Sequence, residues 1–316
     1  MNFKLSIIVP CFNEQEVIIK TYNEINAIFE SSKFNIEIIF VDDGSIDKTL
    51  SMLDEISQKD LRVKVISFSR NFGHQPAVTA GLEYASGDVI SIIDADLQDP
   101  PDVIVSMLDE WKKGAKVVYG VRKNRKESIY KKASYYIFYR LYSAVSDITV
   151  ALDSGDFCLL DREVVDKINS LPEKNRFIRG LRSWVGYSQV PVYYDRQDRQ
   201  GGEPKYTFSK LLNLAMDGLF NFSVKPLIGV FYAGIITSML ALFLAIFYLA
   251  FRIFNIELMG AYSSESQGFT TLVVLILLIG GLQILAVGII GQYVSRIYQE
   301  VKSRPTYIIK KIINDK

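Results

Sequence analysis

The sequence predicts an α/β protein in which a mostly parallel, doubly wound sheet is followed by two transmembrane helices. Short β-branched runs alternate with helix-like patterns up to residue 120, as expected of such a sheet. Carboxylates follow several of these runs, at the positions where open α/β sheets bind their ligands. Two long segments after residue 225 carry almost no charge, which is typical of membrane-spanning helices.

The composition combines a soluble-looking part with an apolar part. Hydrophobic residues make up 49% of the 316 residues and charged residues 22%, with a mean hydropathy of +0.16. This average is too apolar for a soluble enzyme although the charge content is normal for one, so the apolar residues must be concentrated. The net charge of +1 gives no reason to expect nucleic acid as a partner.

The two cysteines and the N-terminus indicate a cytosolic redox setting. Cys11 and Cys158 are interpreted as reduced thiols, because two residues at this spacing form neither a disulfide framework nor a zinc site. The apolar run at the N-terminus is too short for a signal peptide.

Each expected strand is a short apolar run that is ended by a turn residue. Pro10 ends the first run, and Pro100-Pro101 prevents extension of the fourth. Gly87 is expected just after a helix C-terminus. We expect strands at residues 5–9, 36–41, 63–67, 89–93 and 117–119, and helices at 15–29, from 49, at 74–85 and at 102–112.

The stretch after the fourth strand is the centre of the chemical prediction. In extended backbone, residues two apart point to the same side, so Asp94 and Asp96 would face one ligand, and Gln98 could join them. Neighbouring carboxylates repel unless a cation lies between them, and carboxylate and amide oxygens suit Mg²⁺ or Mn²⁺ shared with substrate phosphates. The alternative is a polar turn with Asp99 as N-cap and Pro100 at the first helical position.

Acidic residues at the ends of three strands should converge. Glu14, Asp42-Asp43 and Asp94 with Asp96 all stand at the carboxyl ends of expected parallel strands. Their oxygens can accept hydrogen bonds from a nucleotide base or from ribose hydroxyls. The sequence contains neither the glycine-rich fingerprint of dehydrogenases nor a P-loop. Carboxylates and a metal without a glycine cradle indicate a nucleotide-sugar donor.

Four motifs then resemble a known family. They are Ile8-Val9-Pro10-Cys11-Phe12-Asn13-Glu14, Val41-Asp42-Asp43-Gly44-Ser45, Asn71-Phe72-Gly73-His74-Gln75 and Asp94-Ala95-Asp96-Leu97-Gln98-Asp99-Pro100. Together they are similar to family 2 glycosyltransferases with the GT-A fold, a Rossmann-like, mostly parallel sheet. More narrowly, they resemble polyprenyl-phosphate glycosyltransferases of the dolichyl-phosphate mannosyltransferase-like branch. Bacterial undecaprenyl-phosphate (bactoprenol) glucosyltransferases with two membrane helices look most similar, and the resemblance covers nearly the whole chain.

The resemblance implies a role for each matched residue. Catalytic roles would belong to Asp156, within Asp153-Ser154-Gly155-Asp156-Phe157, and to Asp94, which would contact nucleotide or sugar. Asp96 and Gln98 would hold Mg²⁺ or Mn²⁺. The nucleotide pocket would be lined by Pro10, Phe12, Glu14, Asp42, Asp43 and Asp94, and the acceptor phosphate would be bound by Arg122, Arg199 and Lys205.

Some of these positions have simpler interpretations. Asp156 could cap a turn after Gly155. Arg199 and Lys205 could be solvated loop charges, although the glycines beside them suggest a hinged lid. His74, the only histidine, is interpreted as a helix-start or packing residue and not as the base.

The apolar segments predict how the chain meets a membrane. Residues 227–251 and 269–291 each exceed the roughly 20 residues needed to cross a bilayer, with a buried helix of a large soluble core as the alternative. Basic residues flank the pair on its outer sides, so the positive-inside rule places the catalytic domain and both termini in the cytoplasm. Amphipathic stretches at 130–145 and 207–222 are expected at the lipid interface, or else as core or oligomer helices.

The expected domain organisation follows from these segments. The divisions are a cytoplasmic GT-A catalytic domain (1–206), an amphipathic juxtamembrane helix (207–225), a two-helix transmembrane region (226–295) and a basic cytoplasmic tail (296–316). The protein is accordingly expected in the cell membrane.

The expected reaction is inverting transfer of a hexose, glucose in the first place, from a UDP-sugar to undecaprenyl or another polyprenyl phosphate. The product would serve cell-envelope glycosylation, and mannose, galactose, N-acetylglucosamine and an aminoarabinose derivative stay open as the sugar. The resemblance also implies contact with membrane lipids, a homo-oligomer and, if the product is flipped, a separate flippase.

Three other functions compete with this one. A processive polysaccharide synthase would need an intact Q-x-x-R-W motif, but Arg182-Ser183-Trp184 is preceded by Arg179 in place of the Gln. A membrane scaffold would need no Asp-x-Asp pair. A transporter is disfavoured because the two apolar segments lack intramembrane charges.

Overall fold

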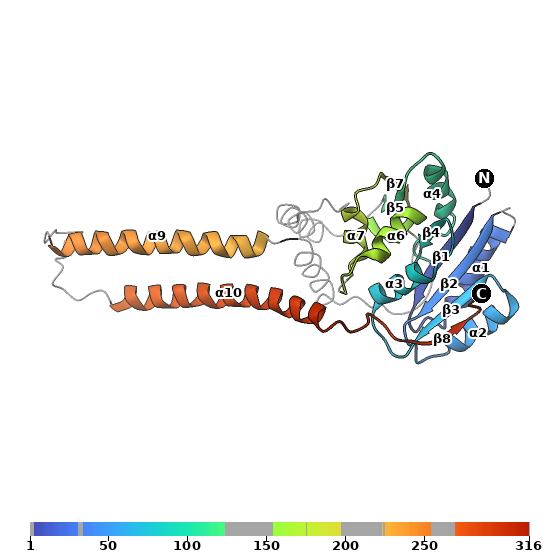
Figure 1. Ribbon diagram of the computed structural model, residues 1–316, viewed down its shortest axis with the longest axis horizontal. Coiled ribbons are helices and arrows are strands. Elements are labelled where there is room, and N and C mark those ends of the chain that lie inside the picture. The colour runs from blue at the N-terminus through green and yellow to red at the C-terminus, as the bar shows by residue number, and fades with distance from the viewer. Residues whose placement is uncertain are drawn as a thin grey trace.

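The predicted α/β architecture is confirmed by a computed structural model, which describes residues 3–30, 34–123, 154–174, 176–196, 223, 225–253 and 269–315. An α/β domain forms one end of the molecule, and two long helices extend from it (Figure 1). The amphipathic stretches at 130–145 and 207–222 lie outside the described residues.

The described strands form an eight-stranded sheet in the order β7-β5-β6-β4-β1-β2-β3-β8. β1 pairs in parallel with β2 and β4, β2 with β3, and β5 with β7, whereas β6 and β8 run antiparallel to their neighbours. The sheet is therefore mostly parallel, as predicted. The strands are β1 (Lys4–Cys11), β2 (Asn35–Asp42), β3 (Val63–Phe68), β4 (Val89–Ile92), β5 (Val117–Arg122), β6 (Ser154–Asp161), β7 (Gln189–Tyr194) and β8 (Ile309–Ile313).

Helices cover both faces of the sheet, because the central strands are apolar on both sides. Ile7 and Ile38 pack on one face, and Ile8 and Ile39 on the other. The helices on the first face are α1 (Ile18–Glu30), α2 (Thr49–Lys59) and α4 (Val103–Lys112), and those on the second are α3 (His74–Tyr84), α6 (Arg162–Ser170) and α7 (Ile178–Trp184). This three-layer arrangement explains why almost the whole of β1, β2 and β4 is buried and mostly apolar.

Two details of the sequence prediction need correction. The fifth strand was expected to end before Gly120, but β5 continues to Arg122 because Gly120 lies inside the strand, where a Cβ would come within 2.7 Å of the Tyr194 ring. Asp99 is not the N-cap of the following helix: α4 begins at Val103, and Asp99 is buried against other side chains.

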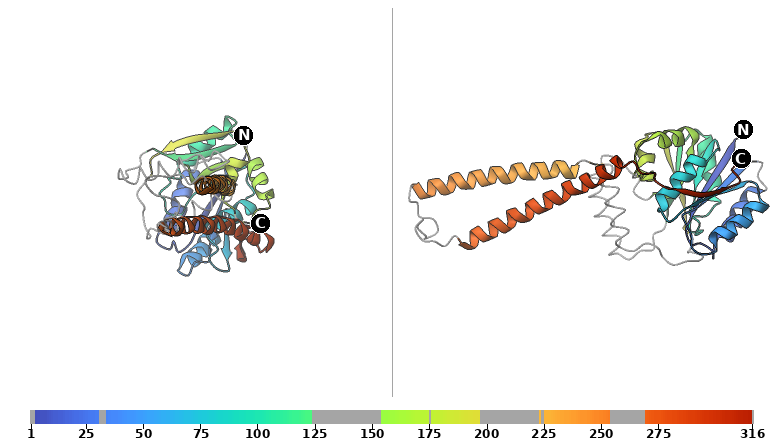
Figure 2. Two further views of the ribbon diagram at one scale, coloured as in Figure 1. Left: turned by 90° about the vertical axis from the view of Figure 1, so that its left-hand side faces the viewer. Right: turned by 60° about the horizontal axis from the view of Figure 1, so that its bottom comes forward.

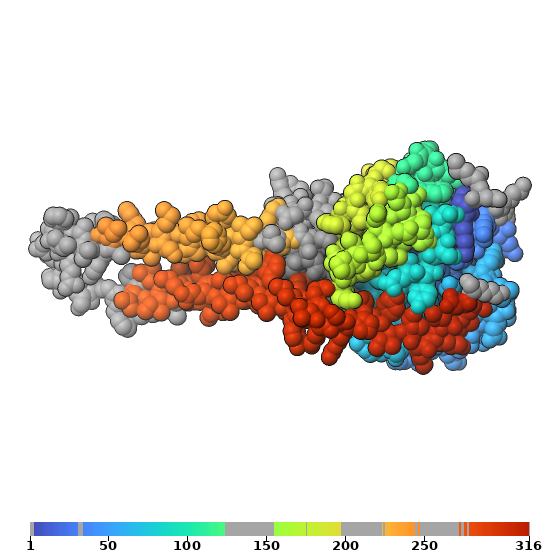
Figure 3. All heavy atoms as spheres, in the orientation of Figure 1, coloured from blue at the N-terminus to red at the C-terminus, as the bar shows by residue number. Residues whose placement is uncertain are grey.

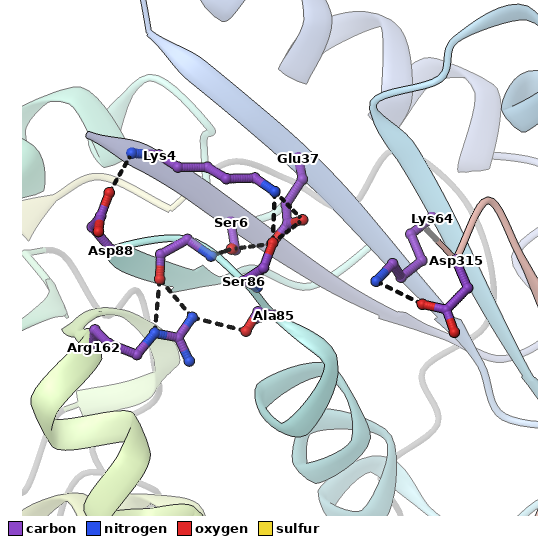
Figure 4. A network of polar contacts seen from close by, with 10 residues as sticks. Lys4, Ser6, Glu37, Lys64, Ala85, Ser86, Asp88, Arg162 and Asp315 are labelled. Atoms are coloured by element: carbon purple, nitrogen blue, oxygen red, sulfur yellow. Dashed lines mark hydrogen bonds and ion pairs between the residues drawn. The ribbon is translucent and has the colours of Figure 1, made fainter. Parts of the chain in front are cut away.

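A buried polar network holds the edge of the sheet at the amino ends of the parallel strands (Figure 4). The Glu37 carboxylate accepts hydrogen bonds from the Lys4 ammonium at 2.8 Å, from the Ser6 hydroxyl, and from the backbone N–H and hydroxyl of Ser86. Burial alone would raise the pKa of Glu37, but these donors, Lys4 first, lower it to about 2. The network joins β1, β2 and the turn that enters β4.

The C-terminal segment returns to the sheet as edge strand β8, which the sequence analysis did not identify. β8 pairs with β3, and the N–H of Ser69 donates to the carbonyl of Ile308 at 2.9 Å. The Tyr307 ring stacks on Phe68 with 4.9 Å between centroids, and Asn314 donates to the carbonyls of Ser57 and Val63. Part of the segment expected as a basic cytoplasmic tail is thus bound to the α/β domain.

The two long helices are α9 (Lys225–Ile253) and α10 (Phe269–Val301). Lys225–Phe243 has a hydropathy of 1.9 and Leu278–Val301 one of 1.6, so both are long and apolar enough to cross a membrane by length and composition. They run beside each other away from the sheet, and their described apolar side chains are largely exposed (Figures 2 and 3). The start of α9 and the end of α10 are the ends that face the α/β domain (Figure 1).

Candidate functional site

The register of the sheet brings the predicted strand ends to one edge. Pro10 pairs with Val41, and Ile8 with Ile92, so the segments that follow β1, β2 and β4 leave the sheet side by side. β6 enters this edge from the opposite direction, with Cys158 opposite Ile92. Residues just before Cys158 therefore lie near residues just after Ile92.

Side chains of the first two loops bind each other's backbone. The N–H of Asn13 donates to the Ser45 hydroxyl at 2.9 Å, and the Asn13 amide oxygen accepts from the N–H of Ile46 at 2.9 Å. The N–H of Glu14 donates to the Thr49 hydroxyl at 2.8 Å. Pro10 and Glu14 are buried and Phe12 is half-buried, so Phe12 presents the more accessible surface of the three.

Asp42 and Asp43 both hold the loops at this edge. Asp42 is fully buried and accepts from the Ser67 hydroxyl at 2.9 Å and from the N–H of Ser45 at 3.2 Å. Asp43 accepts from the N–H groups of Phe72 and Gly73. Burial raises the pKa of Asp43 above its ordinary value, and the two backbone donors only partly offset this.

Gly44 permits the close approach of two loops. Its φ is +68°, and a Cβ there would come within 2.4 Å of the carbonyl carbon of Arg70. A side chain at this position would be strained and would push the loop after β3 away from the loop after β2.

Asp94 contacts His74 at the start of α3. His74 Nε2 lies 3.1 Å from Asp94 Oδ1, and the two side chains are 32% and 40% exposed. Burial would lower the pKa of His74, but the hydrogen bond and charge of Asp94, with the charge of Asp156, raise it to about 9. Burial would raise the pKa of Asp94, yet the hydrogen bond and charge of His74 lower it below its ordinary value.

Asp156 is held by a bidentate ion pair. Arg179 Nε and Nη2, from α7, each donate to a carboxylate oxygen of Asp156 at 2.8 Å. His74 Nδ1 lies 3.9 Å from Asp156 Oδ2, and the Asp156 side chain is only 9% exposed. Although burial opposes it, the charge of Arg179 holds the pKa of Asp156 well below its usual range. Asp156 is therefore an ionised carboxylate and a weak base.

The predicted metal ligands follow β4 on a turn. Asp94, Asp96 and Gln98 are partly exposed while the residues between them are buried, although Leu97 has a φ of +56° and the backbone is not an extended strand. Asp96 accepts from the N–H of Gln98 at 3.1 Å, and the Gln98 amide oxygen accepts from Arg196. No cluster of three or more His, Cys, Asp or Glu side chains that could hold a metal occurs within the described residues.

These two oxygen donors fit the chemistry of Mg²⁺ or Mn²⁺. Such ions often take only one or two protein carboxylate or amide oxygens, and fill their other positions with water and substrate phosphate. Asp96 and Gln98 could supply that pair, provided that Arg196 leaves the Gln98 oxygen.

Arg122 lies in a buried polar cluster at the end of β5. Its Nη2 is 3.5 Å from Asp99 Oδ1, and its Nε donates to the Tyr194 hydroxyl at 3.3 Å. The Tyr194 hydroxyl in turn donates to Asp99, which is 1% exposed. Burial raises the pKa of Asp99, although the charge of Arg122 opposes this. The Arg122 side chain is a quarter exposed and is therefore partly accessible.

The structure leaves two predicted residues undescribed and adds others. Arg199 and Lys205 lie outside the described residues. His74 begins α3, as expected, but it also contacts Asp94, and neither Arg179 nor Arg196 was selected from the sequence. The only signal for His74 was its place in the motif of residues 71–75.

Comparisons with known proteins show the family of this chain. The profile of "Glycosyl transferase family 2" matches residues 6–169. An uncharacterized glycosyltransferase of Bacillus subtilis, YkcC, is 46% identical, covering 98% of this chain and 94% of its own. The SfII prophage-derived bactoprenol glucosyl transferase of Shigella flexneri is 40% identical, covering 98% of each chain.

Solved structures show weaker similarity. The glucosyl-3-phosphoglycerate synthase of Mycobacterium tuberculosis in complex with UDP is 18% identical, with a TM-score of 0.48, covering 69% of this chain and 78% of that one. The family assignment therefore depends on the sequence matches, which extend from the first strand into α6 and, in the relatives, over nearly the whole chain. This chain belongs to glycosyl transferase family 2.

Proposed function

We propose that this glycosyltransferase transfers glucose from UDP-glucose to undecaprenyl phosphate, or to a closely related polyprenyl phosphate, with inversion at the anomeric carbon. The observation that carries the proposal is the combination of a carboxylate-lined sheet edge with two apolar helices. A bactoprenol glucosyl transferase that is 40% identical over 98% of both chains supports the choice of glucose and of the lipid.

The donor would bind at the ends of β1, β2 and β4. Phe12 and Asp94 have accessible surface there, and Asp94 would contact the nucleotide or the sugar. Pro10, Glu14, Asp42 and Asp43 are buried, so they would shape the wall of the nucleotide pocket and hold its loops.

Asp96 and Gln98 would hold Mg²⁺ or Mn²⁺ beside the diphosphate. The bound ion would supply positive charge that stabilises the departing UDP. Arg196 contacts Gln98 in the described structure, and it would turn toward phosphate when the ion takes its place.

The acceptor phosphate needs orientation more than activation. A phosphate monoester has its second pKa near about 6, so its oxygen is largely ionised at neutral pH. Asp156, itself ionised, would orient the acceptor and not act as a strong base. Arg122, Arg199 and Lys205 would offset the repulsion between two anionic substrates.

The two helices would hold this site at the membrane surface. We propose that α9 and α10 span the cell membrane with the catalytic domain and both termini in the cytoplasm. Lys225 at the start of α9 and Arg296, Lys302 and Arg304 near the end of α10 lie at the catalytic end and fit the positive-inside rule. The proposed domain divisions, a homo-oligomer and a separate flippase belong to the same hypothesis.

The test is a transfer assay with purified protein in detergent. We would supply undecaprenyl phosphate and Mn²⁺ or Mg²⁺ with each of a panel of radiolabelled UDP- and GDP-sugars, and measure label in the organic phase. The expected result is transfer from UDP-glucose, dependent on the added ion, and a loss of about 100-fold or more in Asp96→Ala. Transfer only from a nucleotide sugar other than UDP-glucose would refute glucose as the transferred sugar. Binding of UDP without any lipid product would refute polyprenyl phosphate as the acceptor.

A further inference from the structure

Four charged side chains form a continuous row across the candidate site. Asp94 contacts His74 at 3.1 Å, and His74 lies 3.9 Å from Asp156. Asp156 is bound by Arg179 at 2.8 Å through two hydrogen bonds. The signs alternate along the row, which starts after β4, crosses the N-terminus of α3 and β6, and ends on α7.

The His74 ring is fixed by its neighbours on both sides. Asp43 binds the N–H groups of Phe72 and Gly73, which sets the position at which α3 begins. The amide oxygen of Gln75 accepts from the N–H of Ile178 at 2.8 Å, and its nitrogen lies 3.4 Å from His74 Nδ1. The Gln75 side chain therefore links α3 to α7 directly beside the ring.

The row balances two carboxylates that would otherwise repel. Among the described residues, Asp94, Asp156 and Arg179 are the charged groups that act most strongly on the ring, and Asp43 also lies near it. Two of these, Asp94 and Asp156, lie on opposite sides of the imidazole, and a cation between them lowers their mutual repulsion. The pKa of His74, raised to about 9, is consistent with a positive ring at neutral pH.

We propose that His74 is a positioning residue: its ring fixes Asp94, on the donor side, and Asp156, on the acceptor side, in the separation that glycosyl transfer requires. The inference rests on the proposed function, because it assigns the two carboxylates to the two substrates. Arg179 anchors the far end of the row on α7. His74 itself acts through the carboxylates and does not need to touch either substrate.

This role predicts a change in kcat with little change in UDP affinity. Of the residues assigned to the nucleotide pocket, only Asp94 belongs to the row, whereas Pro10, Phe12, Glu14, Asp42 and Asp43 stand at the ends of β1 and β2 or just after them. Loss of the ring would let Asp94 shift relative to Asp156, which Arg179 still holds. A misplacement of about 1 Å can cost about 100-fold in rate. A substitution that restores a cation should restore part of the rate, whereas a neutral substitution of similar size should not.

The experiment compares His74→Gln and His74→Lys with wild type in the full-length protein. Lys59→Gln, on the exposed end of α2, is the matched control for loss of a positive charge. We would measure kcat and KM for UDP-glucose in lipid transfer, and the Kd for UDP with Mn²⁺. In His74→Gln, the expected result is a kcat lowered about 10- to 100-fold and a UDP Kd within about twofold of wild type. The kcat of His74→Lys should be at least about fivefold higher than that of His74→Gln.

A spectroscopic measurement keeps this test separate from the proposed reaction. His74 is the only histidine, so ¹⁵N-histidine labelling gives the NMR signals of one ring. The expected signals are those of an imidazolium at pH 7 in wild type, with a lower titration midpoint in Asp156→Asn and in Asp94→Asn.

The outcomes are distinguishable. A wild-type enzyme that transfers no sugar to polyprenyl phosphate refutes the proposed function, while the NMR result still decides whether His74 bridges the carboxylates. The positioning role is overturned if His74→Gln keeps the wild-type kcat, or if its UDP affinity falls as much as its kcat. It is also overturned if the kcat of His74→Lys is no higher than that of His74→Gln, or if neither Asp substitution changes the titration midpoint of the ring.

Discussion

Glu37 and Asp156 are carboxylates with lowered pKa values that lie at opposite ends of the sheet's parallel strands, and their partners give them different roles. Glu37 is surrounded by Lys4, Ser6 and Ser86 and ties strands together (Figure 4). Asp156 is paired with Arg179 beside His74, at the edge where ligands bind in such sheets. The first is expected to matter for stability and the second for turnover.

Glu37 should make stability depend on acidic pH. Its folded-state pKa of about 2 lies below the unfolded value, so its contribution is fully present above the unfolded pKa and is lost as pH falls toward the folded one. At neutral pH this linkage is worth about 3 kcal/mol. Glu37→Gln should therefore lower the free energy of unfolding at pH 7, and the gap to wild type should narrow at pH 3.5.

Urea unfolding followed by tryptophan fluorescence measures this gap, because both tryptophans, Trp111 and Trp184, lie in the α/β domain. Glu55→Gln, an exposed carboxylate on α2, is the control and should behave like wild type. A gap between Glu37→Gln and wild type that stays constant from pH 7 to pH 3.5 would contradict the account.

Asp156 should set the rate without setting its pH dependence. Because Arg179 keeps the carboxylate ionised, the rise of kcat with pH should follow the acceptor phosphate, with a midpoint near about 6. Asp156→Asn should lower kcat about 10- to 100-fold and leave that midpoint unchanged. A pH–rate profile of both enzymes checks this, and a midpoint moved by more than about one unit would identify Asp156 as the titrating base.

At the level of elements, the sequence predicted the parallel core but not its additions. The strands of β1, β2, β3 and β4 are apolar on both faces, so periodicity and composition alone identify them. β8 was not predicted from the sequence because it is short and contains Lys310 and Lys311, and because its partner β3 lies more than 200 residues earlier. The contacts of His74 could not be predicted either, because they depend on the register between β4 and β6, which are also far apart in the sequence.

The β8 segment should stabilise the catalytic domain through Tyr307. Its ring stacks on Phe68, and its hydroxyl donates to Glu83. Tyr307→Ala should lower the free energy of unfolding by about 1–3 kcal/mol, and Tyr307→Phe by less because the stacking is kept. Urea unfolding with tryptophan fluorescence measures both. Equal effects of the two substitutions would show that the ring contact contributes nothing.

At the scale of the whole molecule, the end of α10 is tied to the catalytic domain at two points. The Glu300 carboxylate accepts from the N–H of Lys174 at 3.1 Å, and β8 follows within ten residues as an edge of the sheet. The Tyr293 hydroxyl also donates to the carbonyl of Ser223, just before α9. These contacts connect the end of α10 to the domain and to the start of α9. Figure 2 shows the two helices extending together from one end of the domain.

The most direct test of the central claim is the stoichiometry of the reaction. Purified enzyme would receive UDP-[¹³C]glucose, undecaprenyl phosphate and Mn²⁺, with UDP release and the lipid product measured together by mass spectrometry. The account predicts one labelled glucose per lipid for each UDP released, with no longer product. Release of UDP without glucose on the lipid, or several glucoses on one lipid, would contradict it and indicate a hydrolase or a processive synthase respectively.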